Sequence, residues 1–553
     1  MTNDVTTTTP TWREIGRKKR EQVRASLPTQ WCLSNVPSAQ EEPNALAFSR
    51  THLSAREIEI TEHYSASQLL QLLANGSLSA TEVLEAFAHR ATIAHQLTNC
   101  LSEVFFDEAK AQAQRLDQYY AEHGKPIGPL HGLPVSLKDQ FRVKGVETSL
   151  GYISWLGKVE TEESESWLVS RLREMGAVLY CKTNVPSSLM AIETNNNIIG
   201  YTTNAHNRLL SSGGSSGGEA ALLAMRGSIL GLGSDVGASI RQPSAYNGIV
   251  GIKPTSTRFP YLGIANSMEG QTIVRSSIGV MGHTIPDLRL LTKTILSLEP
   301  WNSDPNVVPI PWRQEMETQI RDKIREKNLV FGVIRNDGIV TPHPPILRAV
   351  DETVAALKAN GYKVIEISPP SHSEAFQILW NTFAADGGTE IHSTLTQSGE
   401  PPVPELAISY GEKLGHLPPT PLNETWTLTT QKHAYETRYA AFWRAHDLDA
   451  IICPAAPTLS HRPGEGRYFG YTGVWNVLDY SAVTVRSGRR AEKEGDDGKI
   501  KTKEGLDGEV MGQYDPELFD GMPIGLQVVC RKFEEEKVLA IAEEVETILL
   551  GKD

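Results

Sequence analysis

Cysteine, long apolar runs and metal-binding motifs are all scarce in this chain. Its 553 residues include five cysteines, none of them in a CxxC pair. Widely spaced cysteines are typical of reduced thiols in an intracellular protein, so we expect a cytoplasmic location. No segment approaches the ~20 apolar residues of a membrane span. No HExxH motif or tight cluster of His, Cys and carboxylates indicates a metal, and no cofactor is expected.

Basic residues are also few relative to acidic ones. The formal net charge is -13, and nucleic-acid binding is not expected because phosphate contact needs a basic surface. The N-terminus has no apolar signal-peptide core. The basic run over 17–20 has two interpretations, a localisation signal or the solvated face of a helix, and the second is favoured.

The order of apolar patterns predicts an α/β fold. A capping box at Thr11-Trp-Arg-Glu14 predicts a short helix that ends near Leu27, and boxes at Ser65 and Ser79 open two more helices. Beyond them, short apolar runs bounded by Gly and Pro alternate with helical stretches, which indicates a large, mostly buried sheet. We expect an N-terminal helical arm over 1–60 and one large domain over 61–553. A segment dense in charge and glycine, about 486–512, is predicted to be an exposed loop.

The stretch "SSGGSSGGEAALLAM", residues 211–225, is the most unusual part of the sequence. A flexible linker is the simplest interpretation. A nucleophile elbow fits the G-x-S-x-G pattern, but the residues before it do not look like a strand. A phosphate-binding loop would need a lysine where Glu219 stands, and the nearby glycines over 231–237 match a dinucleotide fingerprint poorly.

A fourth interpretation joins this stretch to two others. They are HGLPVSLKD, residues 131–139, and GLGSDVGASIRQP, residues 231–243. Together with KTNVPSSLMAIETNNNIIG and SAYNGIVGIKPT, these segments resemble the amidase signature family, and the likeness to fungal acetamidase-type members runs along most of the chain. The resemblance implies α/β/α layers around a large, twisted, mixed β-sheet.

The resemblance also implies a catalytic triad of Lys138, Ser215 and Ser239. Amide hydrolysis needs a nucleophile and a base, and a lysine can act as the base when burial keeps it neutral. Lys138 follows an apolar run, which makes burial plausible. In the family the bridging serine, here Ser215, follows a cis peptide bond and relays the proton between the lysine and the nucleophile, here Ser239. Ser216, Asp235 and Arg241 match supporting positions.

The segment around the expected nucleophile would form the oxyanion hole. Backbone N–H groups of Val236, Gly237, Ala238 and Ser239 are the expected donors. The family most often has glycine where Ala238 stands, and alanine would distort the hole if the site required a positive φ. The resemblance implies that Leu189 and Ser215 contact the substrate, with Met190 and Glu193 as further candidates.

The sequence therefore predicts a serine amidohydrolase that forms an acyl-Ser239 intermediate. A small aliphatic amide such as acetamide is the expected substrate, with aryl amides, longer amides or esters as alternatives. Two other classes remain open: a transamidating subunit of a complex, and a pseudoenzyme that binds an amide without turnover. A homodimer is also left open.

Overall fold

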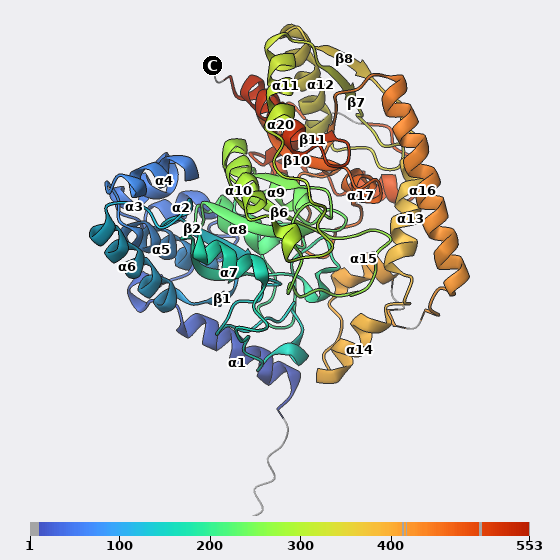
Figure 1. Ribbon diagram of the computed structural model, residues 1–553. Coiled ribbons are helices and arrows are strands. Elements are labelled where there is room, and N and C mark those ends of the chain that lie inside the picture. Colours follow the sequence, from blue (N-terminus) through green and yellow to red (C-terminus); the bar gives the residue numbers. More distant parts are fainter. Residues whose placement is uncertain (1–9, 412–413, 416, 497–499, 552–553) are drawn as a thin grey trace, which may run out of the picture.

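A single mixed sheet of eleven strands runs through the centre of the molecule (Figure 1). The computed structural model describes residues 10–411, 414–415, 417–496 and 500–551. The strands are β1 (Leu101–Val104), β2 (Pro134–Lys138), β3 (Val178–Thr183), β4 (Leu230–Asp235), β5 (Val250–Lys253), β6 (Ser277–Gly282), β7 (Val330–Val333), β8 (Lys363–Glu366), β9 (Ala450–Pro454), β10 (Ser481–Arg490) and β11 (Pro523–Cys530).

The strand order is β1-β3-β2-β4-β6-β5-β10-β11-β9-β7-β8. β2 is parallel to β3 and β4, and β7 is parallel to β8 and β9, while the neighbours between these two groups are antiparallel. The α/β fold class predicted from the sequence is confirmed. Parallel β2, β3 and β4 point their carboxyl ends the same way, and ligands of α/β sheets bind at such ends.

Helices cover both faces of this sheet (Figure 1). The blue helices α2–α6 lie to one side, while orange α16 runs along the opposite edge. The helices are α1 (Trp12–Ala25), α2 (Ala45–Arg50), α3 (Ala55–Ile58), α4 (Ala66–Ala74), α5 (Ala80–Thr98), α6 (Phe106–His123), α7 (Trp167–Glu174), α8 (Gly217–Ala224), α9 (Arg241–Tyr246), α10 (Ile285–Ser297), α11 (Gln314–Arg325), α12 (Pro344–Ala359), α13 (His372–Phe383), α14 (Thr389–Ser398), α15 (Ala407–Tyr410), α16 (Leu422–Ala445), α17 (Gly470–Val477), α18 (Leu506–Gly512), α19 (Pro516–Phe519) and α20 (Glu535–Leu550).

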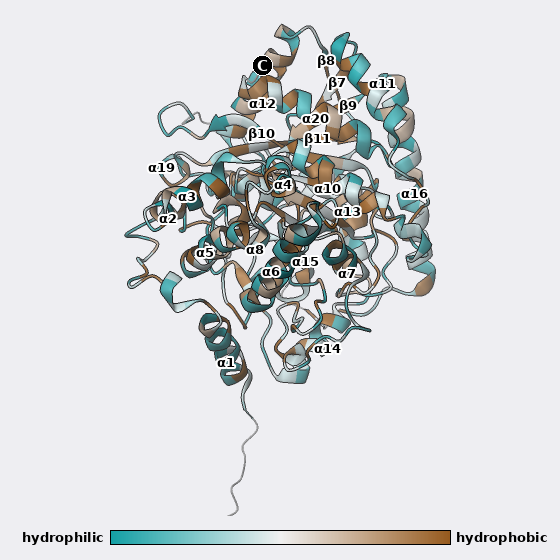
Figure 2. Cartoon of the chain, turned by 60° about the vertical axis from the view of Figure 1, so that its left-hand side comes forward, coloured by the Kyte–Doolittle hydropathy of each residue, from teal (hydrophilic) through white to brown (hydrophobic). Residues whose placement is uncertain are grey.

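Short helical turns complete the chain, namely η1 (Thr29–Trp31), η2 (Glu59–His63), η3 (Ile153–Trp155), η4 (Ser187–Leu189), η5 (Pro300–Asn302) and η6 (Pro404–Leu406). Hydrophobic residues gather on the strands and on the inner sides of the helices, whereas the outer side of α11 is largely hydrophilic (Figure 2). The largest buried cluster includes residues from Leu27 to Val545 in the sequence. One core therefore joins the two ends of the chain. No helix in the described ranges has the length and apolar character of a membrane span.

The predicted capping residues start their helices as expected. Thr11 and Ser65 form complete capping boxes with Glu14 and Gln68, and Ser79 accepts a hydrogen bond from the backbone N–H of Glu82. Each side-chain oxygen satisfies a backbone donor that the first turn of a helix leaves free. These local signals located three helix starts without any tertiary information.

The basic run over 17–20 is not uniformly solvated. Lys19 is buried, and its ammonium group pairs with Glu103 at 2.5 Å and with Glu147 at 3.0 Å. Arg20 donates to the backbone oxygen of Ile198, while Lys18 is exposed. The favoured interpretation of a solvated helix face is therefore wrong for Lys19 and holds for the other three residues of the run, which are exposed. Lys19 and Arg20 attach α1 to the body of the protein.

The exposed loop predicted over about 486–512 is wrong at both ends. β10 extends to Arg490 and α18 begins at Leu506. The charges there have partners: Arg486 forms an ion pair with Glu546 at 2.8 Å, and Asp496 pairs with Arg348 at 2.7 Å. Dense charge indicates exposure only when the charges lack partners, and these partners come from distant segments. Residues 497–499 lie outside the described residues.

Candidate active site

Two neighbouring strands and one glycine-rich turn bring the expected catalytic residues together. Lys138 ends β2 and Asp235 ends β4, which pairs with β2 in parallel. Ser215 and Ser216 lie in the turn that leads into α8, and Ser239 lies between β4 and α9. The hydrogen bond from the Ser216 N–H to the Ser239 backbone oxygen, 3.1 Å, joins the turn to the segment after β4.

Lys138 is completely buried, as its apolar sequence context predicted. Its Nζ lies 2.8 Å from Ser215 Oγ, 2.8 Å from Ser234 Oγ and 3.4 Å from the Ser234 backbone oxygen. Burial lowers the pKa of Lys138 to about 7, because the charged form loses its hydration. The charges of Asp235 and Glu219 act in the opposite direction and only partly offset this effect.

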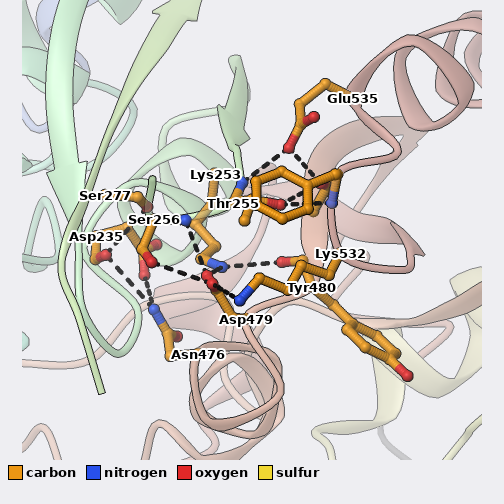
Figure 3. Close-up of polar contacts among 12 residues, drawn as sticks. Asp235, Lys253, Thr255, Ser256, Ser277, Asn476, Asp479, Tyr480, Lys532 and Glu535 are labelled. Carbon is orange, nitrogen blue, oxygen red and sulfur yellow. Dashed lines mark hydrogen bonds and ion pairs between the residues drawn. The ribbon is translucent and has the colours of Figure 1, made fainter. Parts of the chain in front are cut away.

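The partners of Lys138 distinguish it from the other fully buried lysines, Lys182 and Lys253. Lys182 pairs with Asp139 at 3.5 Å, and Lys253 pairs with Asp479 at 3.6 Å and donates to the Tyr480 backbone oxygen at 2.9 Å (Figure 3). Within the described part of the chain, Lys138 forms no ion pair, and its partners are hydroxyl and carbonyl oxygens. Lys138 is therefore the buried lysine placed to exchange a proton with a serine.

The glycine-serine stretch is a buried turn rather than a flexible linker, because every residue from 210 to 218 is buried. The Gly214–Ser215 peptide bond is cis, as the family resemblance implied. A side chain at Gly214 would meet the backbone N of Glu193 at 2.8 Å and the backbone O of Ala191 at 2.9 Å. Among the described residues no strand leads directly into the turn, and only an isolated bridge between Thr203 and Ser211 lies before it. The nucleophile-elbow interpretation therefore lacks the strand it needs.

Asp235 and Arg241 hold the segment that contains Ser239. Two hydrogen bonds join them, Nη2 to Oδ1 at 2.8 Å and Nε to Oδ2 at 3.0 Å, and both side chains are fully buried. Burial alone would raise the pKa of Asp235, but the charge and hydrogen bonds of Arg241, together with the Ile240 N–H and Asn476, outweigh it and lower the pKa to about 2.

Asn476 of α17 completes this support. It donates to Asp235 Oδ1 at 2.9 Å and accepts from Arg241 Nη2 at 2.5 Å. Figure 3 shows Asn476 reaching Asp235, with Ser277 on the neighbouring strand. The ion pair of Asp235 and Arg241, to which Asn476 is also hydrogen-bonded, thus fixes both ends of the segment that contains Ser239.

The backbone between these two residues adopts a conformation that alanine can occupy. Ala238 does not have a positive φ, so its side chain causes no backbone strain. At Gly237, by contrast, a side chain would meet Phe469 Cε2 at 3.2 Å. Among the hydrogen bonds of the described residues, none uses the backbone N–H of Val236, Gly237, Ala238 or Ser239 as donor. These four groups are available to a bound molecule.

A narrow pocket opens at this segment. The centre of a water molecule can occupy a volume of about 20 Å³ in it. The residues that line it are Leu189, Met190, Ala191, Ile192, Val236, Gly237, Ala238, Ser239, Phe383 and Phe469. Ser188 and Leu189 have φ values of 69° and 65°, which non-glycine residues rarely adopt. Glu193 does not line the pocket, because its carboxylate accepts hydrogen bonds from Tyr201 and from the N–H groups of Gly464 and Gly466.

Several residues of the site were not identified from the sequence. They are Ser234 and Gln140 beside Lys138, Asn476 beside Asp235, and the pocket residues Phe383 and Phe469. Ser234 directly precedes Asp235 in a strand that ends at the site. Among the missed residues, this position was the one local signal in the sequence that could have identified a site residue. Gln140 directly follows the segment over 131–139 but no pattern marks it, and the remaining residues lie too far from the motifs in sequence to be linked to them. No group of three or more His, Cys, Asp and Glu side chains in the described ranges could hold a metal ion.

Comparison with known proteins agrees with this arrangement. The family model described as Amidase matches residues 82–539. An acetamidase of Emericella nidulans is 44% identical over 97% of this chain and 98% of that protein, and an acetamidase of Aspergillus oryzae is 43% identical over 97% and 99%. The solved structure of a fatty acid amide hydrolase has a TM-score of 0.92 and 34% identity, covering 98% of this chain and 95% of that one.

These matches, with the mixed sheet, define an α/β enzyme that hydrolyses amides. The chain belongs to the amidase family.

Proposed function

We propose that this enzyme hydrolyses amides through an acyl-Ser239 intermediate, with Lys138 as the base and Ser215 as the proton relay. The observation that carries the proposal is the 2.8 Å contact between Lys138 Nζ and Ser215 Oγ in a fully buried site. A pKa of about 7 suits a general base at neutral pH, because an appreciable fraction of the lysine is then neutral.

In the acylation step, Ser239 Oγ attacks the amide carbonyl carbon. Its proton passes to Ser215 Oγ while the Ser215 proton passes to Lys138 Nζ, which becomes an ammonium group. The tetrahedral intermediate then collapses with cleavage of the C–N bond. The leaving nitrogen takes a proton back through the same relay, so that ammonia and the Ser239 ester are formed.

In the second step, water attacks the ester carbonyl. Its proton follows the same route to Lys138, and collapse of the intermediate releases the carboxylic acid and returns the proton to Ser239. In both steps the carbonyl oxygen carries negative charge. The backbone N–H groups over 236–239 are the proposed donors to it, and each such donor contributes roughly 3–4 kcal/mol of transition-state stabilisation. Asp235 and Arg241, through their buried pair, keep these donors in place, and Ser216 supports the turn beside them.

The proposed substrate is a small aliphatic amide such as acetamide. The pocket beside Ser239 leaves only about 20 Å³ for the centre of a water molecule, little more than one water needs. Leu189 and the aromatic rings of Phe383 and Phe469 form its apolar wall. Such a pocket suits a methyl or ethyl group, and the fungal relatives are acetamidases.

Labelling with a fluorophosphonate tests the nucleophile. The reagent should phosphonylate Ser239, found by peptide mass spectrometry, and Ser239→Ala should abolish both the adduct and amide hydrolysis. A matched control is Ser267→Ala, which removes another buried serine hydroxyl, bonded to Tyr152, and should keep the adduct. An adduct on Ser215 instead, or no adduct in folded protein, would contradict the proposal.

A series of amides tests the substrate. Acetamide and propionamide should be hydrolysed with kcat/KM at least about tenfold above hexanamide and benzamide, because one methylene in a hydrophobic pocket changes selectivity by about 10–200-fold. A preference for the longer or aryl amides would overturn the assignment of the acyl group while leaving the catalytic residues in place.

Two further properties belong to this proposal. We propose a cytoplasmic location, since all five cysteines are free thiols and reducing compartments keep thiols in this form; fluorescence microscopy of a tagged chain tests it.

We also propose a homodimer. Leu422 and Trp426, four residues apart on α16, are each 65% exposed, and contiguous exposed apolar patches mark contact surfaces. Light scattering should give twice the 60.8 kDa of one chain, and a monomer mass would exclude it.

A further inference from the structure

We propose that Gln140 is a positioning residue that directs the lone pair of neutral Lys138 toward Ser215. Gln140 is fully buried two residues after Lys138, and its side chain reaches Ser234 rather than the lysine. The inference rests on the proposed function, in which Lys138 is the base. It concerns the direction of each hydrogen bond around Nζ, which can be worked out from the donors and acceptors present.

The orientation of the Gln140 amide is fixed first. Its Nε2 donates to the backbone oxygen of Ala265 at 3.2 Å and to Tyr261 Oη at 3.0 Å. A backbone carbonyl can only accept, so the NH₂ end must face Ala265 and the carbonyl end must face Ser234. Gln140 Oε1 is therefore an acceptor at the Ser234 hydroxyl. The backbone N–H of Ala265 also donates to the Gln140 backbone oxygen at 3.0 Å, which holds the two segments together.

The direction of the Ser234 hydroxyl follows. A serine hydroxyl has one proton, and Ser234 Oγ donates it to Gln140 Oε1. Ser234 Oγ then faces Lys138 Nζ, 2.8 Å away, with lone pairs only. The Ser234 backbone oxygen, 3.4 Å from Nζ, is likewise acceptor-only.

The lone pair of Lys138 is now assigned by elimination. The ammonium form has three N–H groups and three acceptors: Ser234 Oγ, the Ser234 carbonyl and Ser215 Oγ. When one proton leaves, neither Ser234 atom can donate in its place. Ser215 is the partner that still has a hydroxyl proton to donate, so the lone pair faces Ser215 and the relay is set in the productive direction.

Replacing Gln140 would release this constraint. In Gln140→Met, the Ser234 hydroxyl can turn and donate to Lys138, which competes with Ser215 for the lone pair. We expect kcat to fall about tenfold or more, which is part of the ~10²–10⁴-fold rate increase that general-base catalysis supplies. KM should be nearly unchanged because the substitution does not touch the pocket. A hydrogen bond donated to the neutral form of Lys138 stabilises that form and lowers its pKa. The acid limb of the pH–rate profile should therefore move to lower pH. Asp235 and Glu219, the charged groups that face Lys138, stay in place.

Two comparisons separate this role from a structural one. Gln140→Glu keeps an oxygen that accepts from Ser234 in either protonation state. Its negative charge would raise the pKa of Lys138, so kcat is compared on the alkaline plateau of the pH–rate profile, where it should stay within about threefold. Tyr261→Phe removes a hydrogen bond from the same amide but leaves Ala265 to fix its orientation, and should also stay within about threefold.

A double-mutant cycle with Ser234→Ala is the decisive experiment. Without the Ser234 hydroxyl no donor competes for the lone pair, so Gln140→Met in that background should cost less than about twofold, and the double variant should be faster than Gln140→Met alone. The readouts are the rate of fluorophosphonate labelling at Ser239 and kcat/KM for acetamide, from about pH 6 to about pH 9. Near-ultraviolet circular dichroism checks that each variant is folded.

The outcomes are distinct. Equal costs of Gln140→Met in both backgrounds, or an unshifted acid limb, would overturn the role of Gln140 while wild-type labelling at Ser239 upheld the proposed function. If Gln140→Met does not fold, a loss of more than about tenfold in Gln140→Glu would overturn it, because that variant keeps the acceptor. Wild-type protein that is not labelled at Ser239 would reject the proposed function and this inference together.

Discussion

The basicity of Lys138 comes from its surroundings. Hydroxyl and carbonyl oxygens surround its Nζ, and burial lowers its pKa to about 7. Lys182 and Lys253 are buried equally well, but each faces a carboxylate within ion-pair distance. Burial also lowers the pKa of Lys253, to about 8, so its carboxylate partner only partly offsets burial; Lys138, which has no such partner, has the lower pKa.

The pH dependence of the reaction follows from this residue. The base acts in its neutral form, so activity should rise as the pH increases through the pKa of Lys138, about 7, and level off above it. Below that point kcat/KM should fall about tenfold per pH unit. Steady-state kinetics with acetamide measures the profile. A flat profile across neutral pH would mean that another group sets the rate.

Residues 237 and 238 give a second prediction at this scale. Ala238→Gly should leave kcat/KM within about threefold, because Ala238 already has an ordinary φ. Gly237→Ala should lower it at least about tenfold, since the new side chain would press on Phe469 at 3.2 Å and shift the backbone donors. Equal losses in both variants, measured with acetamide, would contradict this account of the segment.

Motifs identified the residues of the site whose chemistry they carry, but not Ser234, which lies within the segment over 231–243. Lys138, Ser215 and Ser239 belong to short patterns that carry their chemistry. Gln140 reaches Ser234 across 94 residues and Asn476 reaches Asp235 across 241. Such contacts depend on strand pairing, which no local pattern specifies.

At the scale of elements, local chemistry predicted helix starts better than long-range partnerships. Capping boxes located α1 and α4 because both partners lie within four residues. The segment over 486–512 was assigned wrongly only in part, because Arg486 and Asp496 find their partners in α20 and α12, whereas residues 492–495 and 501–505 are exposed as predicted. The same limitation hid the attachment of α1, whose buried Lys19 faces Glu103 on β1.

The attachment of α1 can be measured. Lys19→Met should lower the free energy of unfolding by roughly 3 kcal/mol, because it leaves the mostly buried Glu103 and Glu147 carboxylates, 13% and 16% exposed, without a cation. This loss in the free energy of unfolding should become smaller at acid pH, where the two carboxylates bind protons and lose their charge. Lys18→Met, at an exposed position of the same helix, is the matched control and should change stability by less than about 0.5 kcal/mol. Similar unfolding curves in urea for both variants would contradict the ion pairs.

At the scale of the whole molecule, one sheet and one core connect the two ends of the chain. β5 pairs with β10 across some two hundred residues of sequence, and α20 packs against β10. Arg258 joins the middle of the chain to α20 through Glu536 at 2.9 Å. The largest buried cluster includes residues from strands toward both ends of the sheet, among them Leu101 of β1 and Phe331 of β7.

Thermal unfolding should therefore occur in a single transition, even though chains of this length often unfold domain by domain. Scanning calorimetry checks it: the calorimetric and van't Hoff enthalpies should agree within about 20%. Two separated transitions would show that the arm or one half of the sheet unfolds independently.

The support of Arg241 also has a consequence during synthesis. Its guanidinium group is held by Thr472 and Asn476 of α17 and by Gln527 of β11, which emerge from the ribosome long after Ser239. A nascent chain that already contains the whole triad still lacks the groups that fix the segment around the nucleophile. Hydrolytic activity should accordingly appear only near the completion of translation. A shortened translation product would contain an intact triad and be inactive.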